Sequence, residues 1–364
     1  MSQGYAWPEA RQAYARARAL GAQLGETQQA VFVFMGLWAG CFTAGETRAA
    51  QELADQLLEV AVRDGTPTSL VWAHSTLVTT QFVRGELEAA RDHCTRAMAR
   101  YREEDYLWSE VDPGMNTLAF ASMAACELGL ADEARTRVRE AFALAQRLNR
   151  PYLLALAEAA ALAVYPVLGD AQRAGAHAAR LLQLATEQHL AVFVAIAKMS
   201  AGRVLALEGR PDDGIATLRE GLAEYFASGQ RTGLGRPLGW LAEAQLAAGA
   251  VADARATVED ALAAVRDEAI WVPELLRLRG KIAAAAGAAT ATVEASYQEA
   301  IALAHSFGAK MVELRATTSL GRWLQSCDRA AEAHALLAPL YATFTEGFDT
   351  LDLQEAKALL DELG

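Results

Sequence analysis

The side chains best suited to chemistry in this sequence are six histidines, four cysteines and several adjacent acids. No two histidines stand four residues apart, the spacing that would place two metal ligands on one helical face, and no cysteines have CxxC spacing. Adjacent acids such as Asp212-Asp213 and Glu103-Glu104 fall at expected turns or helix ends, where a carboxylate suits the helix dipole. These residues therefore predict packing and surface roles and no metal site.

Motifs for nucleotide binding and nucleophilic catalysis are also missing from the sequence. Gly280-Lys281 lacks the upstream glycine of a GxxxxGK(S/T) phosphate loop, and neither HExxH nor GxSxG occurs. The tryptophans fit core positions, and Trp72 is the one that we also consider for ligand contact. We therefore expect a protein without catalytic residues or a cofactor, which by itself neither hydrolyses ATP nor makes a cyclic nucleotide.

The composition limits the partners of the chain. It has 364 residues, a net charge of −12 and a sequence pI of about 5.1. Nucleic acid is an unsuitable partner, because its binding depends on basic side chains that neutralise phosphates. The N-terminus has no basic-then-apolar signal, and the longest apolar stretch, 153–168, contains Glu158 and Pro166 and is too short to cross a bilayer. We expect a cytoplasmic protein with buried free thiols and no membrane contact.

A repeat of roughly 40 residues organises the chain. Residues 70–104 have the pattern of two amphipathic helices joined by a tight turn at Gly85. The turn glycines are Gly45, Gly85, Gly129, Gly169, Gly209, Gly249 and Gly287, and Asp328 takes the place of glycine in an eighth turn. Self-similarity at this period predicts helical hairpins that stack on their neighbours.

The residues that pack the hairpins keep the same phase. Five positions after the turns stand Ala50, Ala90, Ala134, Ala174, Gly214, Ala254 and Ala333. Twelve positions after the turns stand Leu57, Ala97, Ala141, Leu181, Gly221, Ala261 and Leu340, with Ala300 in this place if the loop after Gly287 carries one extra residue. The small residues allow the two helices of a hairpin to pack closely. The sequence thus predicts an all-α protein, a right-handed α-α superhelix of about eight tetratricopeptide-like hairpins with terminal helices.

The expected boundaries divide the chain into three parts. Residues 1–25 form a lone N-terminal helix, residues 26–346 the repeats, and residues 347–364 a capping helix with an apolar stripe. The N-terminal helix lacks a hairpin partner, so its apolar face predicts either a longer natural protein or a homodimer. The one long connection, 101–114, carries Tyr106 and Trp108, which either fold back onto the solenoid or contact a partner.

Three segments carry a resemblance to a known family: PELLRLRGKI at 273–282, ATVEASYQEAIALAHSFGAKMVELRATTSLGRWLQ at 291–325 and LLAPLYATFTEGFDTLDLQEAKALLDEL at 336–363. They resemble the C-terminal tetratricopeptide region of bacterial class III adenylate/guanylate cyclase–AAA ATPase signalling proteins. Leu351 stands where that family often has proline, and this sequence contains neither the cyclase nor the ATPase. The resemblance, which covers about 236–364, therefore implies a helical sensor or protein-binding region without catalysis.

Resemblance to the tetratricopeptide repeat places the inward side chains of each first helix about thirteen, ten and six residues before the turn. In the N-terminal half these are uncharged: Phe32, Met35, Trp72, Ser75, Asn116 and Met123. In the C-terminal half they are mainly basic: Arg203, Arg236, Arg277, Lys281, Arg315 and Arg322, beside the acids Glu243 and Glu274. We expect either a cationic strip that binds an acidic peptide or domain, anchored by apolar contacts such as Trp72, or structural ion pairs with acids such as Glu274 and Glu313.

The leading expectation is a protein-interaction and regulatory solenoid, the sensor or scaffold region of a cyclase/ATPase signalling protein. Its expected partners are a protein or peptide, including upstream ATPase or cyclase domains. The alternatives are the effector-binding solenoid of a large ATP-binding transcriptional regulator, a stand-alone scaffold, and an enzyme whose site is assembled in the groove. Fold alone does not decide between these functions.

Overall fold

The computed structural model describes residues 27–265 and 267–364. Within these ranges the regular secondary structure is helical and no strand occurs. The predicted helix in residues 1–25, and with it the predicted homodimer contact, lies outside the described residues.

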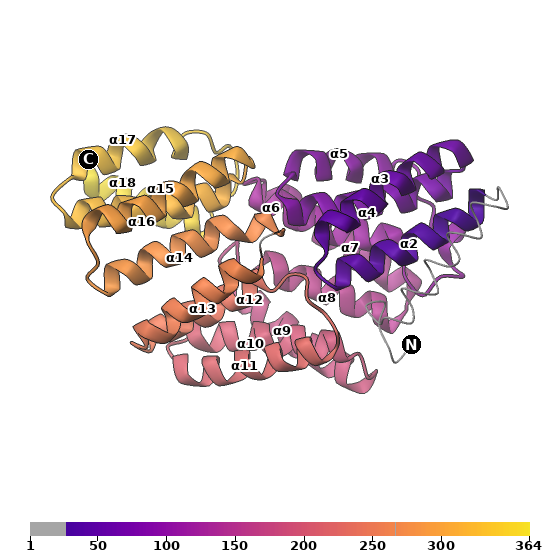
Figure 1. Cartoon of the computed structure of the whole chain (residues 1–364), viewed down its shortest axis with the longest axis horizontal. Helices are drawn as coiled ribbons and strands as arrows, with labels where there is room; N and C mark the ends of the chain where they lie inside the picture. The colour runs from indigo at the N-terminus through magenta and orange to yellow at the C-terminus, as the bar shows by residue number, and fades with distance from the viewer. Residues whose placement is uncertain (1–26, 266) are drawn as a thin grey trace.

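Eight consecutive helical hairpins make up most of the described chain (Figure 1). The first helices are α2 (Thr27–Thr43), α4 (Pro67–Arg84), α6 (Pro113–Glu127), α8 (Pro151–Val164), α10 (Ala191–Leu207), α12 (Gly235–Ala247), α14 (Val272–Ala285) and α16 (Lys310–Ser326). The second helices are α3 (Thr47–Asp64), α5 (Leu87–Met98), α7 (Ala131–Leu148), α9 (Ala171–Glu187), α11 (Pro211–Ala227), α13 (Val251–Ala264), α15 (Thr290–Ser306) and α17 (Ala330–Tyr341). A last helix, α18 (Leu351–Leu363), packs on α16 and α17. The predicted tetratricopeptide-like solenoid is confirmed.

The turn inside each hairpin is closed by a residue in the left-handed conformation. The seven predicted glycines, from Gly45 to Gly287, have φ between 68° and 82°, and Asp328 has φ 60°. In one such turn, the Gly85 N–H donates to the Phe82 carbonyl at 3.0 Å and the Glu86 N–H donates to the Gln81 carbonyl at 2.9 Å. These bonds satisfy carbonyls at the helix end, and glycine adopts the required φ without a Cβ penalty.

The small residues of the repeat lie where the two helices of a hairpin approach most closely. Ala90 and Ala97 are fully buried between α4 and α5. In the fifth hairpin both positions are glycine. A Cβ on Gly214 would lie 2.7 Å from the Gly202 carbonyl oxygen, and one on Gly221 would lie 2.9 Å from the Met199 nitrogen. The two helices of this hairpin, α10 and α11, therefore pack nearly backbone to backbone.

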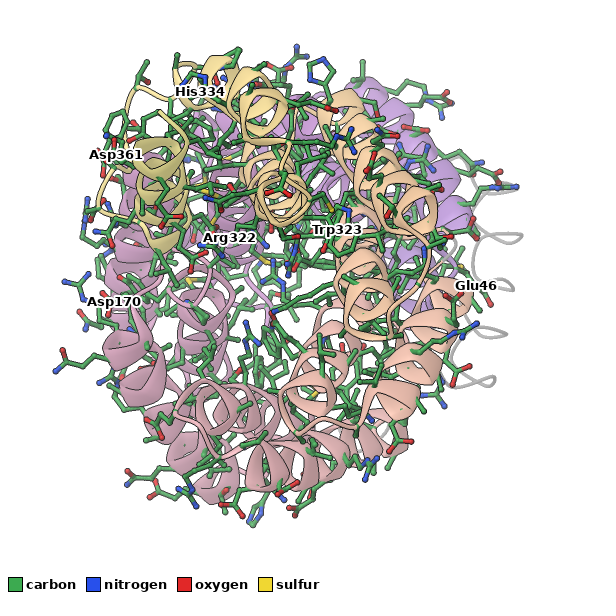
Figure 2. The ribbon with its side chains drawn as sticks, turned by 90° about the vertical axis from the view of Figure 1, so that its left-hand side faces the viewer. Glu46, Asp170, Arg322, Trp323, His334 and Asp361 are labelled. Carbon is green, nitrogen blue, oxygen red and sulfur yellow. The ribbon has the colours of Figure 1, made fainter. Side chains whose placement is uncertain are left out.

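The superhelix is tight enough for late hairpins to contact early ones. The Arg231 N–H donates to the Thr43 carbonyl at 2.8 Å, and the Thr47 hydroxyl donates to the Asp267 carbonyl at 2.7 Å. Farther along, Arg135 on α7 pairs with Asp349 at 2.7 Å, just before α18. In Figure 2 the helices surround a central region, with Arg322 and Trp323 toward it. The solenoid therefore closes on itself.

The long connection between α5 and α6 folds back onto the solenoid through Tyr106. This residue lies in the short 3-10 helix η1 (Glu103–Tyr106), is 1% exposed and stacks on Tyr101 with ring centroids 5.3 Å apart. Trp108 stays 61% exposed, with its ring edge-on to that of Phe32. The expectation that this loop packs on the solenoid is thus confirmed for Tyr106.

Candidate functional site

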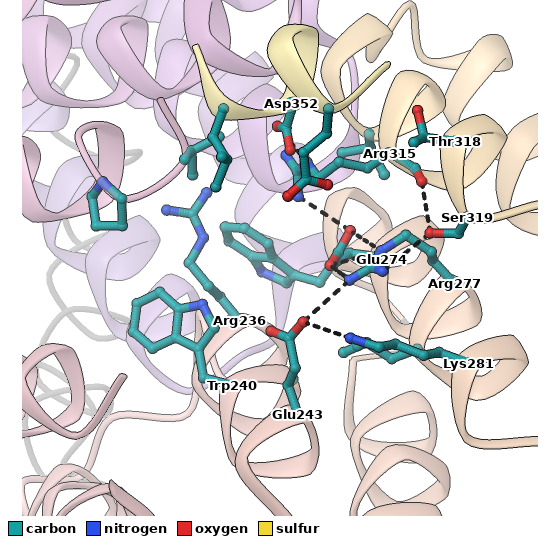
Figure 3. Close-up of a pocket in the computed structure, with 18 of the residues that line it drawn as sticks. Arg236, Trp240, Glu243, Glu274, Arg277, Lys281, Arg315, Thr318, Ser319 and Asp352 are labelled. Atoms are coloured by element: carbon teal, nitrogen blue, oxygen red, sulfur yellow. Dashed lines mark hydrogen bonds and ion pairs between the residues drawn. The ribbon is translucent and has the colours of Figure 1, made fainter. Parts of the chain in front are cut away.

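The basic residues predicted for the inner wall surround one cavity of about 540 Å³, which we call the polar cavity (Figure 3). Its basic lining residues are Arg203, Arg236, Arg277, Lys281, Arg315 and Arg322. They come from α10, α12, α14 and α16, which are successive first helices of the repeat. Because successive repeats stack in the same orientation, residues at the same phase converge on one wall.

Five acids among the described residues line the same cavity: Glu127, Glu243, Glu274, Asp352 and Glu355. The repeat register had identified only Glu243 and Glu274. Glu127 is the last residue of α6, outside the three inward positions, and Asp352 and Glu355 lie on α18, which has no place in the hairpin register. The turn spacing was the only sequence signal for the residues of the inner wall. It does not show which other helices line the cavity, so these three acids were missed.

Glu243 is the acid most surrounded by cations. Its carboxylate pairs with the Arg203 guanidinium, and its Oε1 lies 3.7 Å from Arg277 Nη2 and 3.6 Å from Lys281 Nζ. Burial raises the pKa of this carboxyl, but the three cations outweigh burial and hold the pKa at about 2. Glu243 is therefore ionised throughout the neutral range.

Arg315 is surrounded by acids, as Glu243 is surrounded by cations. Its Nη1 lies 3.1 Å from Glu274 Oε2, its Nε lies 3.0 Å from Asp352 Oδ2, and its Nη2 lies 3.6 Å from Glu127 Oε2. Burial disfavours the charged guanidinium, yet these acids raise the pKa of Arg315 above its ordinary value. Burial also raises the pKa of Asp352 to about 6, although Arg315 opposes this shift.

Arg236 is fixed by a carbonyl, a carboxylate and an aromatic ring. Its Nη1 donates to the Ala163 carbonyl at 2.9 Å and its Nη2 to Glu127 Oε1 at 3.0 Å. The guanidinium carbon lies 4.7 Å from the ring centroid of Trp271. Such stacking suits the flat guanidinium and leaves its edges free to donate.

The cationic strip of the inner wall is therefore largely neutralised by ion pairs. The predicted pairing of Glu274 is present, since Arg277 Nη2 lies 2.6 Å from its Oε1. Glu313 lies outside the cavity, with its Oε1 3.0 Å from His305 Nδ1. Pairs of this kind offset the cost of burying their charges and hold the helices in register. Two cations keep much of their side chains exposed, Lys281 at 48% and Arg322 at 54%.

The uncharged residues predicted for the inner wall lie apart from the polar cavity. Trp72 is 4% exposed and packs with Met35 in one core cluster, where Tyr106 covers it edge-on. Phe32 is half-buried against Trp108. Met123 lines a second cavity of about 250 Å³, which we call the apolar cavity. The structure thus brings the predicted cations together but places the predicted apolar anchors elsewhere.

The polar pair Ser75 and Asn116 also belongs to the N-terminal inner wall. The Asn116 side chain donates to Thr79 Oγ1 at 2.8 Å and to Ser75 Oγ at 3.3 Å. Here α4 and α6 satisfy each other's polar groups, so this wall is closed by its own side chains.

The histidines and cysteines, all of which lie in the described part of the chain, line neither cavity. His74 and His93 face each other with their Nδ1 atoms 2.8 Å apart, and burial lowers the pKa of His74 to about 4. Cys94 and Cys126 are buried free thiols, Cys41 is also buried, and Cys327 is half-buried. In the described part of the chain, no three His, Cys, Asp or Glu side chains are grouped to hold a metal ion, and no helix is long and apolar enough to cross a bilayer.

Comparison with known proteins gives structural relatives but no family. No protein-family model matches the chain, and no curated protein matches it. A Rap protein complexed with Competence and Sporulation Factor is similar over 98% of this chain and 92% of its own, with 13% identity and a TM-score of 0.58. The apo form of the quorum sensor NprR from B. thuringiensis matches over 91% and 92%, with 13% identity and a TM-score of 0.54.

A third similar solved structure belongs to a larger assembly. It is the APC/C hetero-tetramer Cut9–Hcn1, which matches over 96% of this chain and 74% of its own, with 14% identity and a TM-score of 0.52. At these identities the likeness concerns the fold. It confirms the tetratricopeptide-like solenoid, while the resemblance to cyclase–ATPase proteins stays a prediction.

Proposed function

We propose that this chain is a regulatory interaction solenoid that binds a protein or peptide segment in the polar cavity on its inner wall. The proposal is supported by the number of helices that line the polar cavity. Charged side chains reach it from α6, α10, α12, α14, α16 and α18. A ligand bound there touches early and late hairpins at once. Its binding therefore stabilises the closed superhelix relative to any more open form, which is how a ligand shifts a conformational equilibrium.

The solved relatives support this proposal through what their names state. One is a Rap protein in complex with Competence and Sporulation Factor, one is a quorum sensor, and one is Cut9 assembled with Hcn1. Each is a solenoid of this fold that senses or binds another component. We extend that role to this chain and, accordingly, propose no catalysis for it.

The test uses the two exposed cations of the cavity, Lys281 and Arg322. Reversing both to Glu should slow association of a partner isolated by pull-down and should flatten the salt dependence of the rate, because exposed charges act mainly on approach. Stopped-flow association at low and high salt measures both. Arg277 is unsuitable for reversal because it is 8% exposed and held by Glu274, so Arg277→Glu would place three acids together.

A matched control reverses two cations on outer helices. Arg219 on α11 and Arg255 on α13 are exposed, so R219E/R255E makes the same change in net charge away from the cavity. The proposal requires K281E/R322E to slow association by more than the control. Equal rates for both double variants would show that the charges of the polar cavity have only a structural role.

We further propose the narrower role of sensor region in a cyclase/ATPase signalling protein. The segments that carry the resemblance, 273–282, 291–325 and 336–363, form most of α14 to α18 and supply Arg277, Arg315 and other walls of the cavity. The reading frame upstream of Met1 tests this role. An encoded cyclase or ATPase domain in frame would support it, and an unrelated gene there would contradict it.

A further inference from the structure

The apolar cavity adjoins the polar cavity and shares part of its wall. It is lined by aromatic and aliphatic side chains, among them Phe82, Phe120, Met123, Leu156, Phe193 and Met199. Arg236, Trp240 and Trp271 line both cavities. Figure 3 shows Arg236 beside Trp240. The two cavities therefore meet at these three side chains.

The charges of the polar cavity select against a purely acidic ligand. Six basic and five acidic side chains of the described residues line it. A polyanion would approach Glu243 and Glu274 as closely as their arginine partners. A ligand with one charge of each sign avoids this repulsion, because each of its charges finds a partner and none is buried alone.

The accessible charges at the cavity are also of both signs, because Lys281 and Arg322 are basic and Glu355 is acidic. The Arg322 guanidinium pairs with Glu355 at 3.3 Å, and their side chains are 54% and 42% exposed. Exposed pairs of this type contribute little to stability, so exchange for ligand charges costs little. Arg322 and Lys281 suit a carboxylate, while Glu355 suits an ammonium group.

The cavity volumes limit the ligand to a small molecule. Cavities of about 540 and 250 Å³ fall within or just below the range of about 300–1,000 Å³ that is usual for small-ligand pockets. A folded domain does not fit into such a space. A few amino-acid residues do.

We propose that the two cavities form one site for a short peptide that has free ends and an apolar side chain. The apolar side chain occupies the apolar cavity, and the ammonium and carboxylate groups lie among the charges of the polar cavity. This inference rests on the proposed function and narrows its partner, from the acidic segment predicted by the basic strip to a peptide of mixed charge. A short peptide supplies both charges and the apolar group in one molecule.

The experiment is affinity selection with the full chain, read by mass spectrometry. The probe is a synthetic pentapeptide library with one fixed phenylalanine and free ends. Three further probes are the same library with acetyl and amide caps, a library in which glutamate replaces the phenylalanine, and decanoate, an apolar monoanion. Recovered peptides are then measured singly by calorimetry.

Two variants locate the apolar group. Ala159 lines the apolar cavity from α8 and is half-buried, so Ala159→Phe fills the cavity. Ala176 is exposed on the outer helix α9, so Ala176→Phe adds the same ring away from the site. If Ala159→Phe does not fold, Leu156→Trp fills the cavity from another half-buried position. Circular dichroism checks that each variant keeps its helices.

The expected result is recovery of free-ended peptides that bind at least tenfold more weakly to Ala159→Phe and equally well to Ala176→Phe. Capping both ends should also weaken binding at least tenfold. Unchanged binding after capping, unchanged binding to Ala159→Phe, or failure to recover any peptide would overturn the inference. Preference for the glutamate library, or for decanoate, would also overturn it. The association test with K281E/R322E decides the proposed function separately, so an acidic partner would leave that function standing.

Discussion

The turns of the first four hairpins and those of the next three carry the same residue in the same conformation, yet their surroundings differ. A Cβ on Gly85 would lie 2.9 Å from the Phe307 ring, and one on Gly169 would lie 2.5 Å from Leu351 Cβ. A Cβ on Gly129 would lie 2.8 Å from the Phe344 ring, whereas one on Gly45 would lie 3.4 Å from Arg231 Cβ, which is an ordinary contact distance. At Gly209, Gly249 and Gly287, a Cβ would meet no described atom within 4 Å.

This difference shows that glycine has two separate roles at these turns. All seven turns need its left-handed φ, but Gly85, Gly129 and Gly169 also need its lack of a side chain, because later residues of the chain lie within 3 Å of where a Cβ would be. The N-terminal hairpins therefore form a surface on which the C-terminal hairpins close. The same closure brings Glu127 of α6 to Arg315 of α16, so the polar cavity depends on it.

The largest loss of stability should come from Gly169→Ala. The new Cβ would meet both Leu351 Cβ and the Leu351 backbone nitrogen, at 2.5 and 3.0 Å, so no side-chain rotation relieves the clash. Left-handed strain of about 1–2 kcal/mol and overpacking of about 1–3 kcal/mol should together lower the free energy of unfolding by about 2–5 kcal/mol. Urea unfolding measures the loss.

Gly209→Ala is the matched control for this substitution. Gly209 has φ 80°, against 79° at Gly169, but open space around it. Its cost should be the left-handed strain alone, about 1–2 kcal/mol. If the two variants lose the same stability, the contact between early and late hairpins adds nothing to the role of glycine.

The second-largest change in stability should come from a buried acid, Glu268, which lies near a contact between early and late hairpins. Glu268 precedes the short helix η2 (Ala269–Trp271) and accepts hydrogen bonds from the Gly233 N–H at 2.8 Å and the Trp271 indole N–H at 2.9 Å. Thr232, which precedes Gly233 in the connection between α11 and α12, donates to the Phe42 carbonyl of the first hairpin. Burial raises the pKa of Glu268 to about 7, although both donors oppose the shift.

Stability should therefore fall as the pH rises past this acid's ordinary pKa. Between about pH 4.5 and 7 the folded chain keeps a proton that the unfolded chain has released, so its free energy of unfolding decreases with pH and levels off above 7. Glu268→Gln can accept the same two hydrogen bonds without a charge. At pH 8 it should be more stable than the parent, on the order of 2 kcal/mol, and near pH 4 this gain should vanish. Unfolding curves of both proteins at the two pH values give the difference, and a gain independent of pH would contradict the assignment.

A double-mutant cycle can measure the contact at Gly85 directly. Gly85→Ala should cost more in the parent than in a Phe307→Ala background, where the ring that meets the new Cβ is gone. The difference, which is the coupling energy, should be about 1 kcal/mol, because contacting residues couple by about 0.5–3 kcal/mol. The pair Gly249→Ala and Phe307→Ala should be additive. Additivity at Gly85 as well would mean that the ring moves aside freely.

The sequence predicted the repeated part of the fold well because the repeat is local. Turn residues such as Gly209 and Asp328, and small residues such as Ala90, are set by contacts within one hairpin, so each unit carries its own signal. The number and phase of the hairpins followed from that signal. Closure of the superhelix did not, because it depends on how small rotations add up over several repeats, and no single residue type marks it.

The residues of the candidate site also fall into a part that the sequence predicted and a part that it did not. The convergence of Arg277, Lys281 and Arg315 followed from the repeat phase, and so did Glu243 and Glu274. Glu127 reaches the cavity only through closure, and Asp352 lies on α18, outside the hairpin register, so the predicted strip was more basic than the observed cavity. Trp72 was proposed as an anchor from its phase alone, and the folded-back Tyr106 covers it.

The smallest effect should be a gain of stability at a helical glycine that has neither role. Gly175 lies inside α9, and a Cβ there would meet no described atom within 4 Å. Gly175→Ala should therefore raise the free energy of unfolding by about 0.5–1 kcal/mol, because alanine loses less backbone entropy in a helix. Gly221→Ala, also within a helix, should instead destabilise the chain, since its Cβ would lie 2.9 Å from the Met199 nitrogen of α10. Opposite signs in urea unfolding would separate helix propensity from close packing, and two gains would show that α10 and α11 can move apart at little cost.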